Sequence, residues 1–575
     1  MTDTNSDLQN LLLEKRGIRT AEEKEKFLHP DYARDFYDPL LMHDMERAVV
    51  RFFESIEAKE KIVIYADYDC DGIPGAVIMH DLLKKIGYEN FSVYIPDRHD
   101  EGYGLHADAA EQFIKDGVNL LFTIDLGITA VAEVANLEAG GVNVIVTDHH
   151  LPLLRQGYAG QGFDLPKAFA VVNPKLPARN ASQDSDAGGG SYPDPMLCGA
   201  GVAFKFAQAF LSKYGEFYKV TNGWEKWLLD MAGLATLSDM VPLINENRAI
   251  AHFGMKVLRK SPRPGLVELL GKLNIDQRYL TEDDIGFMIA PRLNAASRMD
   301  SPMRAFELLS EKDPARARDL AEHLSKINDE RKILVAQYMK EAYKTLEKRE
   351  LRDVIVVGNP AWKAGVLGLV AGKLCDKYKK PTFVWGHENG DDGVLKGSCR
   401  SVLGVNIVEM MGAVSGSLVA YGGHAAAGGF SVSRGEVHFL EEKLCGVFGQ
   451  KASAENAASV SVIETDAALA LSDVSMKNYE IIERLAPYGV GNPKPIFLFE
   501  NVLVKEVKLF GKEKNHLELT LAKDGAEKKA IAFFSAPDSF SREVASGATA
   551  NILASFDLSY FGGRKTLRLR IIDII

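Results

Sequence analysis

The sequence predicts an α/β protein: a parallel-sheet domain joined by a long helix to a second α/β domain, plus a C-terminal β-barrel. Between residues 61 and 148, short β-rich runs alternate with helical stretches, the pattern of a parallel sheet covered by helices. A similar alternation begins near residue 351. From about residue 496, short strands divided by turns follow one another, which favours a small barrel.

Composition narrows the class of protein. With 575 residues and 46% hydrophobic composition, the chain can bury several cores. Its five scattered cysteines form no CxxC pair, so neither a disulfide framework nor a zinc knuckle is indicated. It shows neither a signal peptide nor an uninterrupted apolar run of about 18 residues, so we expect a cytoplasmic protein without membrane segments.

The net charge of −11 argues against a polyanionic partner only weakly. A nucleic acid responds to a local groove, and metal-binding carboxylates make the formal charge more negative than that of a metal-loaded protein.

The first two domains can be followed in order along the chain. Residues 1–50 are predicted to form a polar helical segment. In the domain at 51–300, the predicted strands are KIVIYA, FSVYIP, NLLFTID and NVIVTD, and the predicted helices include AVIMHDLLKKIG and AVAEVANLEAGG. Residues 154–196 turn irregular, and the segment RNASQDSDAGGGSYPDP predicts an exposed insertion without a catalytic role.

The rest of the chain predicts three further parts. Residues 301–350 combine strong helix formers with charges at i,i+4 spacing and should form connecting helices. The second α/β domain, at 351–450, includes DVIVVG, VLGLVAGKLCDKY and PTFVWG and ends in the glycine-rich YGGHAAAGGFSV. KASAENAAS is a plausible linker before the barrel at 456–575.

Acids and histidines follow three of the predicted strands. The ligand crevice of an open parallel sheet lies beyond the carboxyl ends of its strands, so these side chains should converge there. An oxygen-rich set with imidazole suits Mn²⁺ or Mg²⁺, and two ions about 3.5 to 4 Å apart would hold a phosphate and activate a water. The set comprises Asp67, Asp69, Asp125, Asp148, His149 and His150, with Asp239 as a further contributor.

Other interpretations of these motifs stay open. DYDCDG could begin a calcium loop of the EF-hand kind, but its twelfth position is Ile78 instead of glutamate and a strand precedes it. A turn of solvated aspartates is a second interpretation, and a structural or surface His-His pair is a third. Three acid-bearing strand ends in one domain favour the metal site.

The ordered motifs resemble those of the DHH phosphoesterases, named for the triplet at Asp148, His149 and His150, and within them the RecJ family of single-strand-specific DNA exonucleases. DYDCDG, TIDLGI, TDHHLP and LSDMVPL are similar to the acid motifs, and APRLNAASRMDSP to the arginine motif. KGSCRS and GGHAAAGG resemble motifs of the second, DHHA1, domain, and the barrel resembles an OB-fold. The resemblance covers nearly the whole chain.

This resemblance implies a site with two ions. The implied ligands are Asp67 and Asp125 for one ion, and Asp69, Asp125, His149 and Asp239 for the other, with Asp125 bridging. His150 would contact the scissile phosphate, Asp71 would buttress the loop, and Asp148 would orient a neighbouring histidine. Gly72 would let the backbone turn sharply into the following helix.

Two positions depart from the family pattern. Tyr65 stands where some relatives have a histidine, so the first ion would have one protein ligand fewer. Lys363 replaces the histidine of a Trp-His pair and leaves its phosphate contact open.

The resemblance also places nucleic acid in the groove between the two α/β domains. The implied phosphate contacts are Arg298, Arg400 and Ser398, with Arg98 and Arg292 as weaker candidates. The glycines around His424 would let backbone N–H groups approach a phosphate, or else serve helix packing.

In the barrel, basic residues would follow the DNA backbone and aromatic residues would stack on bases or fill the core. They are Lys505, Lys508, Lys512, Lys514, Arg564, Lys565, Arg568 and Arg570, with Phe510, Tyr560 and Phe561.

The implied function is a metal-dependent, single-stranded-DNA-specific exonuclease that digests 5′ to 3′, releases mononucleotides and acts in repair and recombination. Two alternatives stay open: a phosphodiesterase for short oligonucleotides or cyclic dinucleotides, and a catalytically inactive DNA-binding scaffold. Family analogy suggests single-stranded DNA-binding protein, a RecQ-type helicase and mismatch-repair factors as partners, and we expect a monomer.

Overall fold

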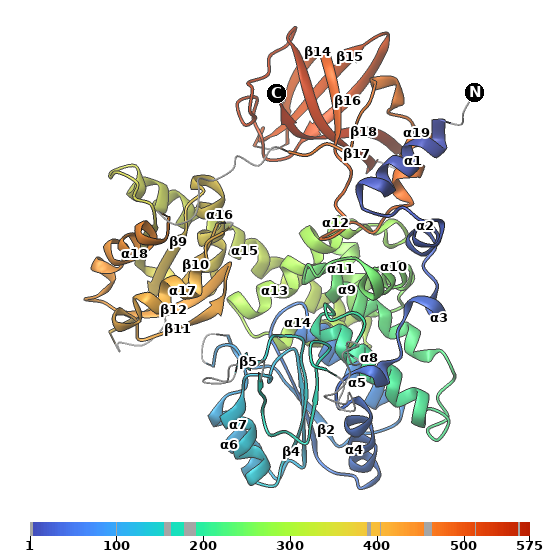
Figure 1. The fold of residues 1–575 in the computed structure, drawn as a ribbon, viewed down its shortest axis with the longest axis vertical. Helices are drawn as coiled ribbons and strands as arrows, with labels where there is room; N and C mark the ends of the chain where they lie inside the picture. Colours follow the sequence, from blue (N-terminus) through green and yellow to red (C-terminus); the bar gives the residue numbers. More distant parts are fainter. Residues whose placement is uncertain are drawn as a thin grey trace. The chain divides into compact units, whose positions relative to one another are not determined.

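The computed structural model describes most of the chain as two compact units (Figure 1). The described residues are 4–98, 101–154, 163–177, 191–387, 393–402, 404–452, 463–511, 513–561 and 564–575. The larger unit comprises residues 38–239 and 254–459, and the smaller comprises 1–37, 240–253 and 460–575.

The larger unit begins with a five-stranded sheet in the order β2-β1-β3-β4-β7, in which every pairing is parallel. Strands β1 and β3 are buried along their whole length, as expected where helices cover both faces. The predicted parallel sheet is confirmed. Its strands are β1 (Ile62–Ala66), β2 (Phe91–Tyr94), β3 (Leu120–Ile124), β4 (Asn143–Thr147) and β7 (Ala170–Val172).

Helices cover the two faces of this sheet (Figure 1). Helices α6 (Ala107–Lys115) and α7 (Val131–Ala139) lie on one face. On the other, the ring of Phe122 packs against Phe52 and Phe206, 5.6 and 4.8 Å between ring centroids. These two phenylalanines belong to α4 (Met45–Glu57) and α8 (Gly199–Tyr214), and α5 (Gly72–Lys85) packs beside them.

One part of the sheet differs from the sequence-based prediction. Residues 170–172, inside the stretch predicted to be irregular, form β7 and pair with β4 from Ile145 to Thr147. Three residues are too few to show a periodicity, and the surrounding polar and glycine-rich segment conceals them. Short strands β5 (Leu153–Leu154) and β6 (Phe163–Asp164) form a separate pair, and residues 178–190 lie outside the described part.

A helical region follows and leads to the second domain. The single helix α15 (Pro314–Leu346) has 33 residues and begins with Asp313 accepting the N–H of Ala315, so the predicted long connecting helix is confirmed. The preceding helices are α9 (Leu229–Ser238), α11 (Pro264–Leu273), α12 (Glu282–Asp284), α13 (Ala290–Met299) and α14 (Met303–Ser310). Helix α10 (Asn245–Leu258) is divided between the two units at residue 253.

The second domain contains a mixed sheet in the order β11-β12-β10-β9-β8. The glycine-rich segment around His424 forms the antiparallel hairpin β11–β12, and a Cβ on Gly428 would lie 2.8 Å from Met411 Cε on α17, so packing against a helix remains a prediction for these glycines. A Cβ on Gly423 would lie 2.4 Å from the carbonyl oxygen of Ala427, which explains a glycine there. The elements are β8 (Ile355–Lys363), α16 (Leu367–Tyr378), β9 (Thr382–His387), β10 (Val394–Arg400), α17 (Ile407–Ala413), β11 (Ala420–His424), β12 (Ala427–Ser433) and α18 (Val437–Ala452).

The smaller unit is built on a closed barrel in the order β14-β15-β16-β18-β17, with β14 also paired to β17. This is the strand order of an OB-fold, and the predicted barrel is confirmed. The strands are β14 (Phe497–Phe510), β15 (His516–Lys523), β16 (Ala526–Ala532), β17 (Thr549–Phe561) and β18 (Arg564–Ile574), flanked by β13 (Ala467–Ala468) and α19 (Met476–Glu483).

Part of the N-terminal segment belongs to this smaller unit. Helices α1 (Thr4–Lys15), α2 (Ala21–Leu28) and α3 (Tyr32–Asp35) fall within it, and Arg16 forms an ion pair of 3.3 Å with Asp466. The predicted helical segment is therefore divided, because α4 belongs to the larger unit.

The described chain contains no helix that combines the length and the apolar composition of a membrane span. All five cysteines are free thiols, as their scattered spacing predicts.

Candidate metal centre and nucleic-acid cleft

The acids after β1, β3 and β4 occupy equivalent positions on neighbouring strands. The N–H of Asp67 donates to the carbonyl of Ile124 at 3.2 Å, and the N–H of Asp125 donates to Thr147 at 3.0 Å. The N–H of Asp148 continues the pattern by donating to Val172 at 3.1 Å. The ladder of the parallel sheet therefore brings all three acids to one edge.

Three carboxylates gather at this edge of the sheet. Ligand oxygens of Asp67, Asp69 and Asp125 lie within 4.8 Å of one another. Burial and the neighbouring carboxylates raise the pKa of Asp67 and of Asp125 well above its ordinary value. The Oδ1 atoms of these two residues are buried and accept no hydrogen bond from the described residues. Unpaired carboxylate oxygens in a buried cluster fit a divalent cation with oxygen ligands.

The backbone of the DYDCDG loop shapes this cluster. The Oδ1 atom of Asp69 accepts the N–H groups of Asp71 and Gly72 at 2.7 and 3.2 Å. A Cβ on Gly72 would lie only 2.3 Å from the carbonyl oxygen of Asp67. Glycine is thus required by a close approach of the backbone as the chain enters α5.

The carboxylate of Asp71 holds the N-terminus of α8. Its oxygens accept the N–H groups of Gly199 and Ala200 at 2.6 and 2.7 Å. Asp71 also lies with His149 and Asp239 in a second group whose ligand atoms are within 4.8 Å of one another. Burial, Asp71 and Asp69 raise the pKa of Asp239 to about 9.

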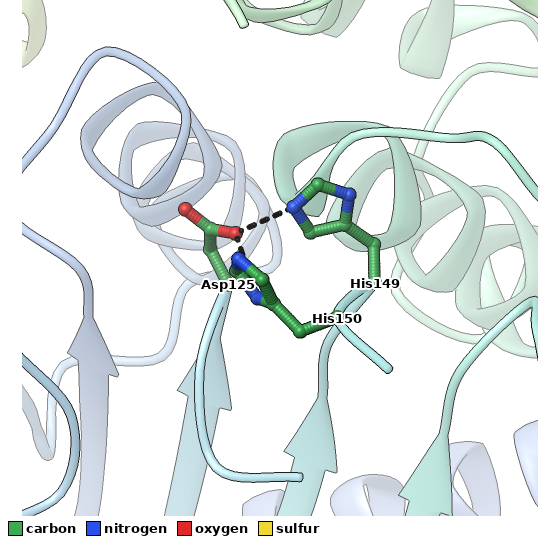
Figure 2. Close-up of side chains that lie close together, drawn as sticks. All are labelled: Asp125, His149 and His150. Carbon is green, nitrogen blue, oxygen red and sulfur yellow. Dashed lines mark ion pairs between the residues drawn. The ribbon is translucent and has the colours of Figure 1, made fainter. Parts of the chain in front are cut away.

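The two histidines lie against Asp125 (Figure 2). The Nε2 atom of His149 is 3.1 Å from Asp125 Oδ1, and the Nδ1 atom of His150 is 3.8 Å from the same oxygen. Burial and the neighbouring His150 lower the pKa of His149 to about 3, so this imidazole is neutral, the form that binds metals.

Asp148 holds His150. Its Oδ1 atom is 2.8 Å from His150 Nδ1, and although burial opposes it, this hydrogen bond raises the pKa of His150. The arrangement is the carboxylate–imidazole pair expected around a metal or phosphate site.

Tyr65 points away from the acids. It is fully buried, its ring stacks on Tyr94 at 5.2 Å, and its hydroxyl donates to the carbonyl of Gly104 at 3.0 Å. The tyrosine is therefore part of the core under α6 and α7, and it does not replace the histidine as a metal ligand beside the acids.

A cavity of about 770 Å³ in the larger unit is lined in part by His150 and His424. The rings of His150 and His424, from the two α/β domains, are parallel with 5.9 Å between their centroids. The glycines of the β11–β12 hairpin form part of its wall. Its other lining residues include Arg98, Ser398 and Arg400.

The other two predicted arginines, Arg298 and Arg292, do not line the cavity within the described residues. Burial and the charges of Arg98, Arg331 and Arg400 lower the pKa of Arg298 to about 9, and its Nη1 atom donates to the carbonyl of Gly365 at 3.2 Å. Arg292 is buried and donates to Met288 at 2.6 Å. Among the residues that the structure describes, neither Arg292 nor Lys363 lines the cavity.

Sequence analysis missed Tyr103. Half of this side chain is exposed in the cavity, and its hydroxyl lies 3.3 Å from His150 Nδ1 and 3.4 Å from the carbonyl oxygen of Asp125. The short EGYG loop carries two glycines with positive φ but no periodicity that would mark it as functional.

A cluster of aromatic side chains lies on the outer face of the barrel. Phe533 and Phe534 are 38% and 79% exposed, and the ring of His516 is 5.4 and 4.8 Å from theirs. The guanidinium of Arg570 lies 5.3 Å from the Phe533 ring centroid, and Phe510 is 5.2 Å from His516. Phe534 adopts a positive φ of 53°, an unfavourable conformation for phenylalanine.

This aromatic face includes only part of the predicted barrel set. Arg568 and Lys505 form ion pairs with Asp557 and Glu527, 2.6 and 2.7 Å long. Lys512 and the side chains of Tyr560, Phe561 and Arg564 lie outside the described part of the chain.

Comparisons with known proteins agree with this architecture. Residues 61–236 match the DHH family, N-terminal domain, residues 351–448 match the DHHA1 domain, and residues 465–573 match the RecJ OB domain. A Bacillus subtilis protein named single-stranded-DNA-specific exonuclease RecJ is 34% identical over 98% of this chain and 67% of its own length. The protein of that name from Haemophilus influenzae is 32% identical over 92% of this chain and 90% of its own.

Solved structures share the fold. RecJ from Thermus thermophilus in complex with Mn²⁺ matches with a TM-score of 0.78 at 24% identity, over 99% of this chain and 76% of that one. A structure of exonuclease RecJ bound to manganese matches with a TM-score of 0.59 at 28% identity, over 72% and 97% of the two chains.

Acids and the Asp-His-His triplet at the strand ends of a parallel sheet, followed by a DHHA1 domain, define a DHH phosphoesterase. The third domain and the extent of the sequence match narrow the assignment within that class. This chain belongs to the RecJ family of single-stranded-DNA-specific exonucleases, and the resemblance found in its motifs is confirmed.

Proposed function

We propose that this chain is a single-stranded-DNA-specific exonuclease that hydrolyses phosphodiester bonds with two divalent ions, Mn²⁺ or Mg²⁺. The observation that carries the proposal is the cluster of Asp67, Asp69 and Asp125, in which the Oδ1 atoms of Asp67 and Asp125 are buried and accept no hydrogen bond from the described residues. Related RecJ structures in complex with manganese or Mg²⁺ support the choice of ion.

The residues of the site fall into metal ligands and a residue that contacts the phosphate. By family resemblance, the proposed ligands are Asp67 and Asp125 for one ion, and Asp69, Asp125, His149 and Asp239 for the other. The structure supports these sets in that Asp67, Asp69 and Asp125 lie together, as do His149 and Asp239. When bound, such ions lower the pKa of a water and neutralise charge on the phosphodiester. His150, held by Asp148, lines the cavity and would contact the scissile phosphate.

The cavity accounts for recognition of the backbone. Arg98 and Arg400 line it, and Arg400 Nη1 lies 3.4 Å from the hydroxyl of Ser398, so a phosphate there would meet guanidinium and hydroxyl donors together. Arg298 lies near enough to Arg98 and Arg400 for their charges to lower its pKa, and it adds to the positive potential there. Arg292 remains a weaker candidate, since its side chain is buried and does not line the cavity within the described residues.

The barrel accounts for a preference for single strands. Exposed rings such as Phe533 and Phe534 can stack on unpaired bases of any identity, each stack contributing about 1 to 3 kcal/mol. Paired bases in a duplex do not offer these faces.

The finer points of the proposal come from family resemblance. They are 5′ to 3′ digestion, release of mononucleotides and action in DNA repair and recombination. Single-stranded DNA-binding protein, a RecQ-type helicase and mismatch-repair factors are proposed as partners, with a monomer working in the cytoplasm.

The test is hydrolysis of end-labelled single strands, matched duplexes and dinucleotides with Mn²⁺ or Mg²⁺. We expect the wild type to degrade long single strands fastest and Asp69→Ala to be inactive, while the control Asp108→Ala, at an exposed acid of α6, keeps full activity. Equal rates for Asp69→Ala and wild type would refute the site, and faster cleavage of dinucleotides would refute the substrate.

A further inference from the structure

The backbone of His149 and His150 is held by three side chains. The N–H groups of both histidines donate to Asp148 Oδ1, at 2.7 and 3.1 Å. On the opposite side of the turn, the carbonyl of His150 accepts the Nδ2–H of Asn173 at 2.9 Å, and the carbonyl of His149 accepts the ammonium of Lys175. All four backbone polar groups of the histidine pair are thus paired with side chains.

The sheet register brings Asn173 and Lys175 to this turn. They follow β7 directly, and Thr147 at the end of β4 pairs with Val172 at the end of β7. Asn173 is fully buried, and its Oδ1 atom accepts the N–H of Lys175 at 2.9 Å. Asn173 and Lys175 therefore bind each other and the histidine pair from the end of the neighbouring strand, and we call these two residues the bracket.

The bracket also faces the acids. Burial lowers the pKa of Lys175, while Asp148, Asp239 and Asp125 oppose that shift because they lie near its ammonium. Lys175 is thus close to the proposed metal ligands, yet its recorded hydrogen bond is to a backbone carbonyl, not to a carboxylate.

We propose that Asn173 and Lys175 are positioning residues that fix His149 for metal binding and His150 for phosphate contact. The inference rests on the proposed function. The outer partners of metal ligands typically affect metal affinity or activity by about 10- to 100-fold, because a ligand that is free to rotate binds less well. The irregular stretch 154–196 therefore supplies two of the four hydrogen bonds to the backbone of the histidine pair.

A different role for Lys175 is direct contact with the DNA backbone, which would give another kinetic result. Loss of a substrate contact raises KM for DNA and leaves Mn²⁺ affinity unchanged. Loss of a positioning contact weakens Mn²⁺ binding in the absence of DNA.

The experiment titrates the full-length chain with Mn²⁺ in a calorimeter, without DNA, and measures kcat and KM on single strands. For Lys175→Met and Asn173→Ala we expect about 10- to 100-fold weaker Mn²⁺ binding and a lower kcat at saturating Mn²⁺ with nearly unchanged KM. Lys175→Arg should recover most of the Mn²⁺ affinity.

The matched control is Lys61→Met. The ammonium of Lys61 donates to the carbonyl of Asp116 at 3.0 Å. Lys61 directly precedes β1, so it lies at the amino-terminal end of the strands, away from the acids at their carboxyl ends. This variant should bind Mn²⁺ like the wild type.

Wild-type Mn²⁺ affinity in Lys175→Met and Asn173→Ala would overturn the inference alone, as would a raised KM for Lys175→Met with unchanged Mn²⁺ binding. Failure of the wild type to bind Mn²⁺ would overturn the proposed function as well. Thermal unfolding identifies a variant that has lost its fold. If Asn173→Ala has done so, the partly exposed Lys175→Met decides the question.

Discussion

Two buried carboxylate clusters lie near opposite ends of helix α5, and they differ in how their charge is balanced. Near the N-terminus, Asp67 and Asp125 keep oxygens that accept no hydrogen bond from the described residues. Toward the other end, Asp81 lies 2.6 Å from Arg263, whose Nε atom is also 2.6 Å from Asp230 on α9.

The pKa shifts of the two clusters have opposite signs. Burial and like charges raise the pKa of Asp125, whereas His80 and Arg263 overcome the effect of burial and lower the pKa of Asp81 to about 2. The comparison teaches that a buried carboxylate balanced within the fold stabilises it. One left unbalanced costs stability and is explained by a cation bound from solution.

The largest expected effect comes from Asp125→Asn. We expect exonuclease activity to fall more than about 100-fold, beyond the usual cost of losing an outer partner of a metal ligand. The metal-free variant should be at least as stable as the metal-free wild type, because a repelled carboxylate has been removed. Activity assays and urea unfolding in EDTA measure both effects, and clear destabilisation would contradict the unbalanced-charge interpretation.

Arg263→Met should have the opposite effect on stability and lower the free energy of unfolding. The substitution removes the cation that the buried Asp81 and Asp230 share, which we expect to lower the free energy of unfolding by about 3 to 5 kcal/mol. Urea unfolding at pH 7 measures this. Adding Asp230→Asn should restore part of the loss, and the exposed pair Lys84–Glu89 provides the control, since Lys84→Met should cost less than about 1 kcal/mol.

The pH dependence of unfolding tests the contribution of Asp81 to stability. Because the pKa of Asp81 is lowered in the folded protein, its contribution is present above about pH 4 and is lost as the pH falls toward about 2. The shift corresponds to about 2 kcal/mol. Urea unfolding in EDTA from pH 5 to 2.5 should show a shallower loss of stability for Asp81→Asn than for the wild type, and identical slopes would contradict the assignment.

The smallest expected effect concerns the barrel. Phe534→Ala should weaken binding of long single strands by about 1 to 3 kcal/mol while leaving Mn²⁺ affinity and hydrolysis of short oligonucleotides unchanged. Fluorescence anisotropy with a labelled oligonucleotide measures this, with the exposed Phe439→Ala of the second domain as control. Equal loss in both variants would argue against stacking at Phe534.

Sequence reasoning reached the parts of the site that are marked by local pattern. Asp67, Asp125 and Asp148 each follow a clear apolar strand, so a parallel sheet alone predicts their common edge. Asn173 and Lys175 were missed because the three-residue β7 has no recognisable period.

Other features depend on contacts that no local pattern records. The ion pair between Asp81 and Arg263 joins residues that are far apart in the sequence. The exposure of Phe533 and Phe534 depends on how the barrel closes. Only the folded chain distinguishes a balanced acid from an unbalanced one.

Anomalous diffraction from Mn²⁺-soaked crystals tests the central claim most directly. The account predicts two manganese peaks at the strand-end edge of the first sheet, with the carboxylate of Asp125 between them, and no peak beside Asp81 and Asp230. The absence of manganese at Asp125, or peaks only at other acids, would contradict it.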